Sequence, residues 1–319
     1  ADAIKRQISK TYLREYRTQW DTHIKHIHIV PFTDVNQAIR HLEILSSDQS
    51  PLKQLLDAIN TNTRHLAANH YAVSQHYAEL NDYSDNLRKA TNYADTKKSL
   101  LALHDYLVTI KQNANPNAAF FNAAKDVINS KKGNPLIALQ RQSQQAPRTV
   151  QRWLNQITAS TWTIMQGHAL SYINAAWETQ IYTQFNEECQ HAYPFTQRSS
   201  AQVSMSSFNH FFAKKGAFDV FFHRYIHPFV NTDNVSWKRY QTEGFSLHIK
   251  QSNLALLKMA DYINKHLYDD NNKLPLEFTI KPLTLSKSAS AIIKNYISIG
   301  HTHYPTIYLD SISYKSNNK

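Results

Sequence analysis

The sequence contains 319 residues, of which 42% are hydrophobic and 12% aromatic, and this apolar content excludes wholesale disorder. Its formal net charge of +11 is dispersed along the chain, a distribution typical of solvated helix surfaces rather than of a nucleic-acid-binding face. Five glycines are too few for a turn-rich all-β protein, and no apolar run approaches the ~18 residues of a membrane span.

The N-terminus and the single cysteine say little about the cellular compartment of the protein. The first ten residues lack the apolar core of a signal peptide, so we expect either a soluble cytoplasmic protein or a piece of a larger one. Because Cys189 is alone, an intramolecular disulfide is excluded, and we expect a buried thiol near the end of a helix.

Three helices are predicted in the first 60 residues. The first covers roughly 3–29 and closes at Pro31, because the residue before a proline is pushed out of helical geometry. Asp34 and the pair Ser50-Pro51 are typical start signals for the second and third helices. Apolar residues at near four-residue spacing mark the first helix: Ile4, Ile8, Tyr12, Tyr16, Trp20, Ile24 and Ile27.

The middle of the chain alternates between polar and periodic stretches. Residues 61–98 are dominated by Asn, His, Tyr, Asp and Thr, which leaves a polar helix and a surface excursion equally open. After helical spacing returns from residue 100, the interval 129–149 has linker chemistry and is the predicted boundary between two helical subdomains. A further helical run fills 148–193 and ends at Pro194.

The segment 207–230 contains eight aromatic residues around Gly216. Their spacing predicts two amphipathic helices joined by a Lys-Lys-Gly turn, in which Gly216 can adopt a positive φ as a C-cap. We interpret this stripe as core packing, and the alternative is an exposed apolar patch that docks a partner. The tryptophans at 153, 162, 177 and 237 are likewise interpreted as core first and interface second.

Towards the C-terminus the apolar period changes from helical to strand-like. A strand with one buried face is predicted around 276–280, and further strands at 297–299 and 306–309 precede a polar tail at 315–319. The last helix before them is marked by Leu254, Leu257, Ile263 and Leu267.

These patterns predict an α+β fold, with a predominantly helical body of multi-helix bundles followed by a small C-terminal β-sandwich-like domain. We expect three parts: a helical subdomain at 1–133, a second helical subdomain with the aromatic hairpin at 134–270, and a β-sandwich portion at 271–319. The length is ample for a buried core.

The order of motifs in the second half carries a family resemblance. From Trp177 to Trp237, the order Trp…Cys…Tyr-Pro-Phe…Phe-x-x-Phe-Phe-x-x-x-Gly-x-Phe-Asp-x-Phe-Phe…Tyr-Ile-x-Pro-Phe-Val…Trp resembles the C-terminal region of the IcmF/TssM family. These are large inner-membrane proteins of type IVB (Dot/Icm) and type VI secretion systems. Residues 134–177 are similar to the family's Pro-Leu…Pro…Trp-Leu…Trp…Trp segment. Similarity to the central part of the family is carried by Tyr16, Trp20, Pro31 and residues 50–56.

The resemblance implies a periplasmic fragment of a protein anchored in the inner membrane by helices outside this chain. The implied role is non-catalytic, a tether that stabilises a multimeric envelope complex through protein–protein contacts. Implied partners are an outer-membrane lipoprotein docking on the C-terminal β region and a DotU-type inner-membrane protein binding parts of the family outside this chain. The Asn-, His- and Lys-rich, Gly-poor composition departs from many type VI members and slightly favours type IVB.

Seventeen histidines raise the question of a metal site. His26/His28 and His301/His303 are His-x-His pairs, whereas His223/His227 are one helical turn apart. Such pairs are expected by chance in a sequence this rich in histidine, and no third ligand stands at a recognisable spacing. We therefore expect surface or packed histidines and predict no metal site.

No catalytic or cofactor-binding residues are predicted. Cys189 has only His191 nearby, which is poorly placed on a helix, and the adjacent Glu187 and Glu188 diverge by about 100° in a helix. The pair Asp269-Asp270 is expected to end a helix in a turn. Since Gly-x-Ser-x-Gly and P-loop motifs are also absent from the sequence, we predict that the chain is not an enzyme and binds no cofactor.

Two alternatives from other functional classes remain open. An anion- or nucleic-acid-binding helical module would need a continuous basic face, and its binding would collapse with moderate salt. A histidine-based metal-binding protein would need stoichiometric metal in the purified protein.

Overall fold

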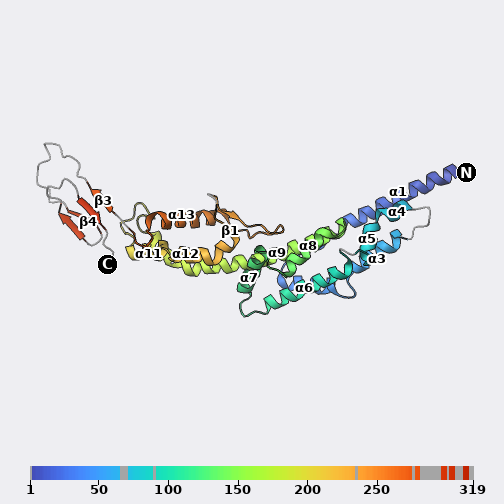
Figure 1. The fold of residues 1–319 in the computed structure, drawn as a ribbon, viewed down its shortest axis with the longest axis horizontal. Helices are drawn as coiled ribbons and strands as arrows, with labels where there is room; N and C mark the ends of the chain where they lie inside the picture. Colours follow the sequence, from blue (N-terminus) through green and yellow to red (C-terminus); the bar gives the residue numbers. More distant parts are fainter. Residues whose placement is uncertain are drawn as a thin grey trace. The chain divides into compact units, whose positions relative to one another are not determined.

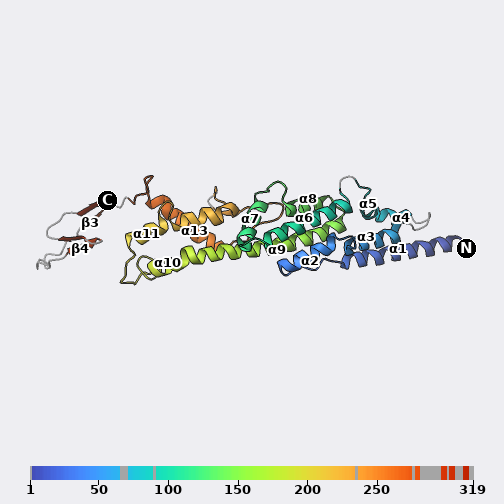
Figure 2. The same cartoon turned by 90° about the horizontal axis from the view of Figure 1, so that it is seen from below.

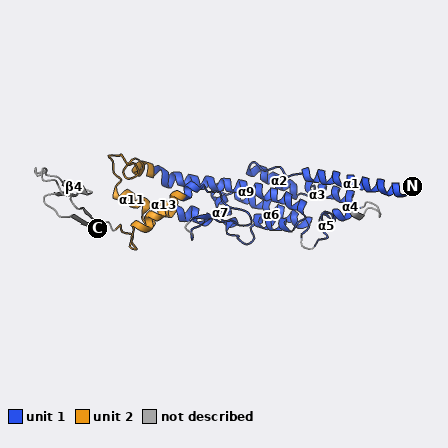
Figure 3. Ribbon diagram, turned by 90° about the horizontal axis from the view of Figure 1, so that it is seen from above, with its two compact units in different colours: residues 1–183, 221–254 blue, residues 184–220, 255–319 orange. Residues whose placement is uncertain are grey.

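The computed structural model describes residues 2–64, 71–88, 91–233 and 236–274, together with the backbone of four short strands between residues 277 and 315. The described chain is mostly helical, which confirms the predicted helical body. It divides into two compact units, drawn in different colours in Figure 3. Unit 1 consists of residues 1–183 and 221–254, and unit 2 consists of residues 184–220 and 255–319.

The first part of unit 1 confirms the predicted helix starts. Asp34 caps the second helix, because its carboxylate accepts hydrogen bonds from the backbone N–H groups of Asn36 and Gln37 at 2.8 and 2.9 Å. Those backbone donors hold the pKa of Asp34 below its usual value. The helices are α1 (Asp2–His26), α2 (Val35–Ser46), α3 (Pro51–Arg64), α4 (Tyr71–His76) and α5 (Ala78–Ser84).

Four further helices complete the bundle of unit 1: α6 (Tyr93–Lys111), α7 (Pro116–Ile128), α8 (Pro135–Gln145) and α9 (Arg148–Trp177). The 30-residue α9 packs against α7 and α8, and α6 packs against α2 and α8 (Figures 1 and 2). Their shared core is apolar and contains Leu100, Leu103, Leu107, Phe120, Leu136, Trp153, Leu154 and Ile157.

The predicted linker at 129–149 is wrong, because most of it is the helix α8. Asn134 caps this helix by accepting from the N–H groups of Leu136 and Ile137, and Pro135 occupies the first turn, where its missing N–H is harmless. The turn before it is short, with positive φ at Ser130 and Gly133. Proline and glycine here mark a helix start and a tight turn.

The predicted domain boundary at residue 133 lies inside unit 1, where α7 and α8 both pack on α9. The two compact units are also discontinuous in sequence, whereas the predicted subdomains are contiguous. The three-part domain assignment remains a prediction.

Side chains of α9 fix the end of α1. The Arg152 guanidinium donates to the carbonyl oxygens of Ile24 and Ile27 at 2.7 and 3.2 Å, and the Trp153 indole donates to the same Ile27 oxygen at 3.0 Å. A cation at a helix C-terminus satisfies carbonyls that have no partner within the helix and matches the helix dipole. The helix α1 therefore ends at His26, before the proline that the sequence indicated as its stop.

The extended chain that follows α1 is also held by α9. Gln156 Oε1 accepts from the backbone N–H of Ile29 at 2.9 Å, and Ser160 Oγ accepts from the N–H of Phe32 at 2.5 Å. Backbone groups of a non-helical segment need such partners when they are shielded from water. One face of α9 thus supplies hydrogen bonds along the whole α1–α2 connection.

After α9 the chain stays helical, but parts of it change from α-helix to the wider π-helix. The π-helical segments η1 (Glu178–Tyr182) and η2 (Asn186–Gln190) flank the short α10 (Thr183–Phe185). The predicted helical run from 148 is therefore confirmed as far as Gln190, with non-α geometry at its end. Cys189 is fully buried, as expected. Burial, with a smaller contribution from the negative charge of Glu188, raises the pKa of its thiol to about 11.

The aromatic segment forms the two predicted helical stretches, α11 (Met205–Phe212) and α12 (Ala217–Phe221), with the π-helical η3 (Phe222–Ile226) and the 3₁₀ turn η4 (His227–Phe229) after α12. The predicted role of Gly216 is wrong, because the positive φ of 63° belongs to Lys215. Gly216 is needed for close approach: a Cβ there would lie 2.8 Å from the carbonyl oxygens of Ala213 and His210.

The single aromatic stripe of the sequence divides between the two units. In unit 2, Phe211, Phe212 and Phe218 surround the ring of Phe185 at centroid distances of 5.2 to 6.5 Å. In unit 1, Phe121 contacts Tyr225 and Phe229 at 5.9 and 5.5 Å. Core packing is confirmed for the buried members: Phe211, Phe212, Phe218, Phe221, Phe222, Tyr225 and Phe229. Trp153, Trp162 and Trp237 are also buried, and Trp177 is half-buried.

The rest of the described chain contains short strands and one helix. In unit 1, β1 (Val230–Asn231) pairs antiparallel with β2 (Lys238–Arg239). The helix α13 (Gln251–Leu267) crosses from unit 1 into unit 2 at residue 255. In the C-terminal part, β3 (Glu277–Ile280) pairs antiparallel with β6 (Ile312–Lys315), and β4 (Tyr296–Ile299) pairs antiparallel with β5 (Thr302–Pro305).

The predicted strands around 276–280 and 297–299 thus correspond to β3 and β4. The predicted strand at 306–309 and most of the polar tail lie outside the described residues. The strands β5 and β6 were not predicted. The structure shows two separate strand pairs here, and it does not show the predicted β-sandwich-like domain. The predicted α+β fold class is therefore confirmed only as a mostly helical protein with small antiparallel sheets.

Candidate functional site

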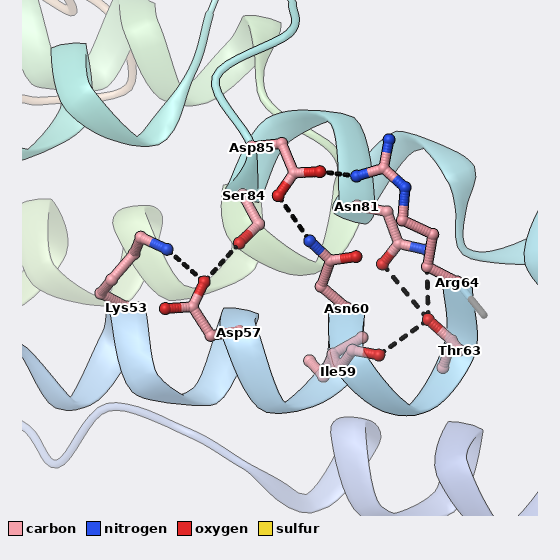
Figure 4. Close-up of polar contacts among 9 residues, drawn as sticks. All are labelled: Lys53, Asp57, Ile59, Asn60, Thr63, Arg64, Asn81, Ser84 and Asp85. Atoms are coloured by element: carbon pink, nitrogen blue, oxygen red, sulfur yellow. Dashed lines mark hydrogen bonds and ion pairs between the residues drawn. The ribbon is translucent and has the colours of Figure 1, made fainter.

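A group of charged and polar side chains joins α3 to α5 (Figure 4). The Asp57 carboxylate accepts from the Ser84 hydroxyl at 2.9 Å and pairs with the Lys53 ammonium. Asp85, the residue after α5, accepts from the Asn60 amide at 2.6 Å and pairs with Arg64, both of which lie on α3. Each carboxylate therefore has one neutral donor and one cation.

The centre of this α3–α5 network is buried. Thr63 donates its hydroxyl proton to the carbonyl oxygen of Ile59 at 2.8 Å and accepts from the Asn81 amide at 3.2 Å. Thr63, Asn81 and Ser84 have exposed fractions of 0%, 3% and 1%. Because the buried Ser84 hydroxyl is bonded to a carboxylate already held by a cation, we interpret the network as helix packing by polar groups.

The same chemistry explains the polar stretch at 61–98. Most of its described residues lie in the helices α3 to α6, so the polar-helix alternative is confirmed for those residues, whereas 85–88 and 91–92 are not helical. Tyr83 is fully buried and shares a 2.5 Å hydrogen bond with Thr96, and burial raises the pKa of its phenol. A hydrogen-bonded core lacks the apolar period by which a buried helix face is recognised in a sequence.

The histidine pairs differ in what their rings contact. His26 Nδ1 and His28 Nδ1 each lie within hydrogen-bonding distance of a backbone carbonyl oxygen, those of Thr22 and His26, at 2.7 and 3.0 Å. His223 and His227 are both exposed, and their rings stack with centroids 5.7 Å apart. His301 lies outside the described residues, and only the backbone of His303 is described.

Asp269 and Asp270 both have structural partners. Asp269 Oδ1 accepts from the N–H groups of Asn271 and Lys273 at 2.9 and 2.7 Å, which confirms the predicted turn after the last helix. Asp270 pairs with Lys214 at 3.4 Å. In the part of the chain that the structure describes, no group of three or more His, Cys, Asp or Glu side chains is placed to hold a metal ion.

An exposed apolar surface lies on α13 within unit 2. Leu256, Met259 and Tyr262 are 45%, 68% and 61% exposed, and the Tyr262 ring stacks on His266 with centroids 3.8 Å apart. The opposite side of the helix is buried through Leu257 and Ala260. Since α13 is apolar on both faces, its outer face is a candidate contact surface.

This outer face was not predicted. Of the four residues that marked the helix in the sequence, Leu254 and Leu257 are buried, whereas Leu267 is 41% exposed. The signal that could have identified the surface was an excess of apolar residues, with Leu256 and Met259 falling between the core positions.

A second exposed apolar stripe lies on α1. Ile4, Ile8 and Tyr12 are 66%, 64% and 59% exposed, although they begin the periodic pattern that identified the helix. Further along α1, Ile24 is buried and the Tyr16 hydroxyl donates to the carbonyl oxygen of Asn62 at 2.8 Å. None of the helices searched among the described residues is long and apolar enough to cross a membrane.

Comparison with known proteins gives a consistent set of relatives. The family profile IcmF-related, described as "Intracellular multiplication and human macrophage-killing", matches residues 1–64. The profile of the type VI secretion protein IcmF helical domain matches residues 168–273. Type VI secretion system component TssM1 of Pseudomonas aeruginosa strain PAO1 is 23% identical over 329 residues, covering 90% of this chain and 30% of the relative.

Two solved structures have the same fold. A type VI secretion system membrane core complex and a type VI membrane complex match with TM-scores of 0.71 and 0.67, each at 13% sequence identity. Both matches cover 99% of this chain, and they cover 66% and 63% of the matched chains. The chain therefore spans about two thirds of those chains and 30% of the length of the curated relative.

Proposed function

Because the chain belongs to the IcmF/TssM family, we propose that it is a structural segment of a bacterial secretion apparatus that spans the cell envelope. The observation that carries the proposal is the fold match over 99% of the chain to a type VI membrane core complex. Two family profiles, one at each end of the helical body, support it.

The system we propose is type VI. The curated relative and both solved complexes are named as type VI components, so the slight preference for type IVB drawn from composition finds no support among them. The relatives are named as components of secretion complexes. We infer from them that this chain has a non-enzymatic role and contains no catalytic residues.

The segment would lie on the periplasmic face of the inner membrane and tether other envelope proteins, with anchoring helices and the DotU-type contact supplied by parts of the protein outside this chain. The strand pairs β3–β6 and β4–β5 would belong to a β-sandwich that docks an outer-membrane lipoprotein. Strand edges present unpaired backbone groups, which suit docking by strand addition. The exposed face of α13 would contact another subunit of the same membrane complex.

The first test removes residues 271–319 from the intact, epitope-tagged protein and compares what co-purifies from envelope extracts. Loss of the outer-membrane component with retention of the inner-membrane partner is the expected result. Unchanged recovery of the outer-membrane component would contradict docking through the β region.

The second arm of the experiment tests α13. Met259→Asp combined with Tyr262→Asp should lower recovery of the complex, because two charges would replace apolar contact surface. Leu101→Asp is the matched control, since Leu101 is 47% exposed on α6. Equal recovery from the α13 variant and the control would remove α13 from the proposed interface.

A further inference from the structure

The surface formed by η3 and η4 in unit 1 brings two histidines together. His223 and His227 are exposed, their ring centroids are 5.7 Å apart and their planes are inclined by 30°. The ring of Phe222 contacts both of them, with centroid distances of 5.3 Å to His223 and 5.8 Å to His227. The two imidazoles therefore stand side by side over one aromatic ring.

Their spacing is close to that of two imidazoles on one metal ion. With Zn–N bonds of about 2.0–2.1 Å and tetrahedral geometry, the centroids of two imidazole ligands lie about 5 Å apart. The observed 5.7 Å is within reach of a small rotation of either side chain. A separation of four residues along a helix is also the spacing at which two histidines can bind one zinc ion.

The backbone beneath the pair is fixed by burial. Phe222, Tyr225 and Ile226 are 8%, 2% and 2% exposed, and Phe222 packs on Trp237 with centroids 4.7 Å apart. Two ligands on a backbone that is already ordered lose less conformational entropy on binding than ligands on a mobile loop. The site is thus partly organised before any ion arrives.

His26 and His28 form a His-x-His pair, whereas His223 and His227 are four residues apart. The Nδ1 atoms of His26 and His28 lie within hydrogen-bonding distance of the carbonyl oxygens of Thr22 and His26, which both belong to α1. Among the described histidines, His223 and His227 are the pair whose rings stack on each other.

We propose that His223 and His227 bind one divalent transition-metal ion of the Cu²⁺, Ni²⁺ or Zn²⁺ class, with water in the remaining positions. Neutral imidazole suits these ions, whereas Mg²⁺ and Ca²⁺ require oxygen ligands. The order of affinities should follow Cu²⁺ above Ni²⁺ and Zn²⁺. With only two protein ligands the ion keeps open positions, and the site is independent of the proposed secretion role.

The test uses the 319-residue chain without a histidine tag, titrated with CuCl₂ and ZnCl₂ by calorimetry. One high-affinity equivalent is expected for each metal, and MgCl₂ should give no heat of binding. His223→Gln and His227→Gln should each weaken binding at least about tenfold, because each removes one of the two nitrogen ligands. The matched control is the double variant His26→Gln, His28→Gln, which removes two histidines and should bind as the parent does.

A second measurement does not depend on any variant. Electron paramagnetic resonance of the Cu²⁺-loaded parent chain should show two coordinated imidazole nitrogens, and circular dichroism should show that the variants retain helical structure. Binding that survives in both single variants, or that is lost in the control, would overturn the proposal. A parent chain that binds neither metal below millimolar concentration would overturn it as well.

Discussion

The α3–α5 and α7–α9 interfaces each join two helices of unit 1, but they do so with different side chains. Thr63, Asn81 and Ser84 are buried and hydrogen-bonded between α3 and α5. Between α7 and α9 the packing is aromatic, with Phe120 buried against His168 and Phe121 buried against Tyr172. The apolar interface follows the helical period in the sequence, whereas the polar one conceals it.

The two interfaces also differ in how their stability is distributed. An apolar interface loses contact area and gains a cavity when one side chain is shortened. When one side chain of a polar interface is removed, one or two hydrogen bonds are lost. Any buried partner that is left without a hydrogen bond then carries its full desolvation penalty. Three measurements test this contrast.

The largest effect is expected at Phe120, which is 1% exposed and stacks on His168 with centroids 4.5 Å apart. Phe120→Ala should lower the free energy of unfolding by about 3–5 kcal/mol, because it opens a cavity between α7 and α9. Urea denaturation followed by circular dichroism measures this. Leu101→Ala, an exposed apolar position, should change the same quantity by less than about 0.5 kcal/mol, and similar losses in both variants would contradict the assigned core.

A smaller effect is expected in the α3–α5 network. Thr63→Val and Asn81→Ala should each lower the free energy of unfolding by about 1–3 kcal/mol, because each leaves a buried polar partner with fewer bonds. The double variant should lose less than the sum, with a coupling of at least about 0.5 kcal/mol. Strict additivity would mean that the 3.2 Å contact contributes nothing, whereas Thr109→Val, at an exposed threonine of α6, should be nearly neutral.

The smallest effect concerns pH at the α7–α9 interface. Burial lowers the pKa of His168, whose Nδ1 lies 2.7 Å from Asn117 Oδ1. The unfolded chain then binds a proton more readily, so stability is fully present above about pH 6.5 and falls as pH drops towards the lower folded pKa.

His168→Gln should therefore make the melting temperature fall less steeply between pH 7 and 5. The matched control is His248→Gln, which removes an exposed histidine bonded to Gln166 of the same helix. If the parent and the His168 variant lose stability in parallel on acidification, protonation of His168 does not govern the stability of this interface.

The same contrast explains what sequence reasoning could reach. Helices α1, α2, α3, α9 and α13 were predicted because apolar periods and caps such as Asp34 mark them locally. α8 was taken for a linker because Asn134-Pro135 is a helix start as well as a turn signal. The close approach at Gly216 depends on the carbonyls of Ala213 and His210, whose positions no local pattern gives.

The candidate surfaces were less accessible to sequence reasoning than the helices. Three histidine pairs were visible as spacings, but the stacking of His223 on His227 depends on the geometry of η3. The outer face of α13 resembles a core face in composition, and only the solvent exposure of Met259 and Tyr262 separates the two. Periodicity identifies apolar faces, and it does not say what covers them.

The hydrogen bonds from α9 to the α1–α2 connection have a consequence for folding order. Phe32 and Ser160 are separated by 128 residues, so a nascent chain cannot complete this bond until α9 has been synthesised. Until then, the amide groups of Ile29 and Phe32 must remain hydrated. A polypeptide truncated after Arg64 would never receive these partners, and its two N-terminal helices would lack a fixed angle between them.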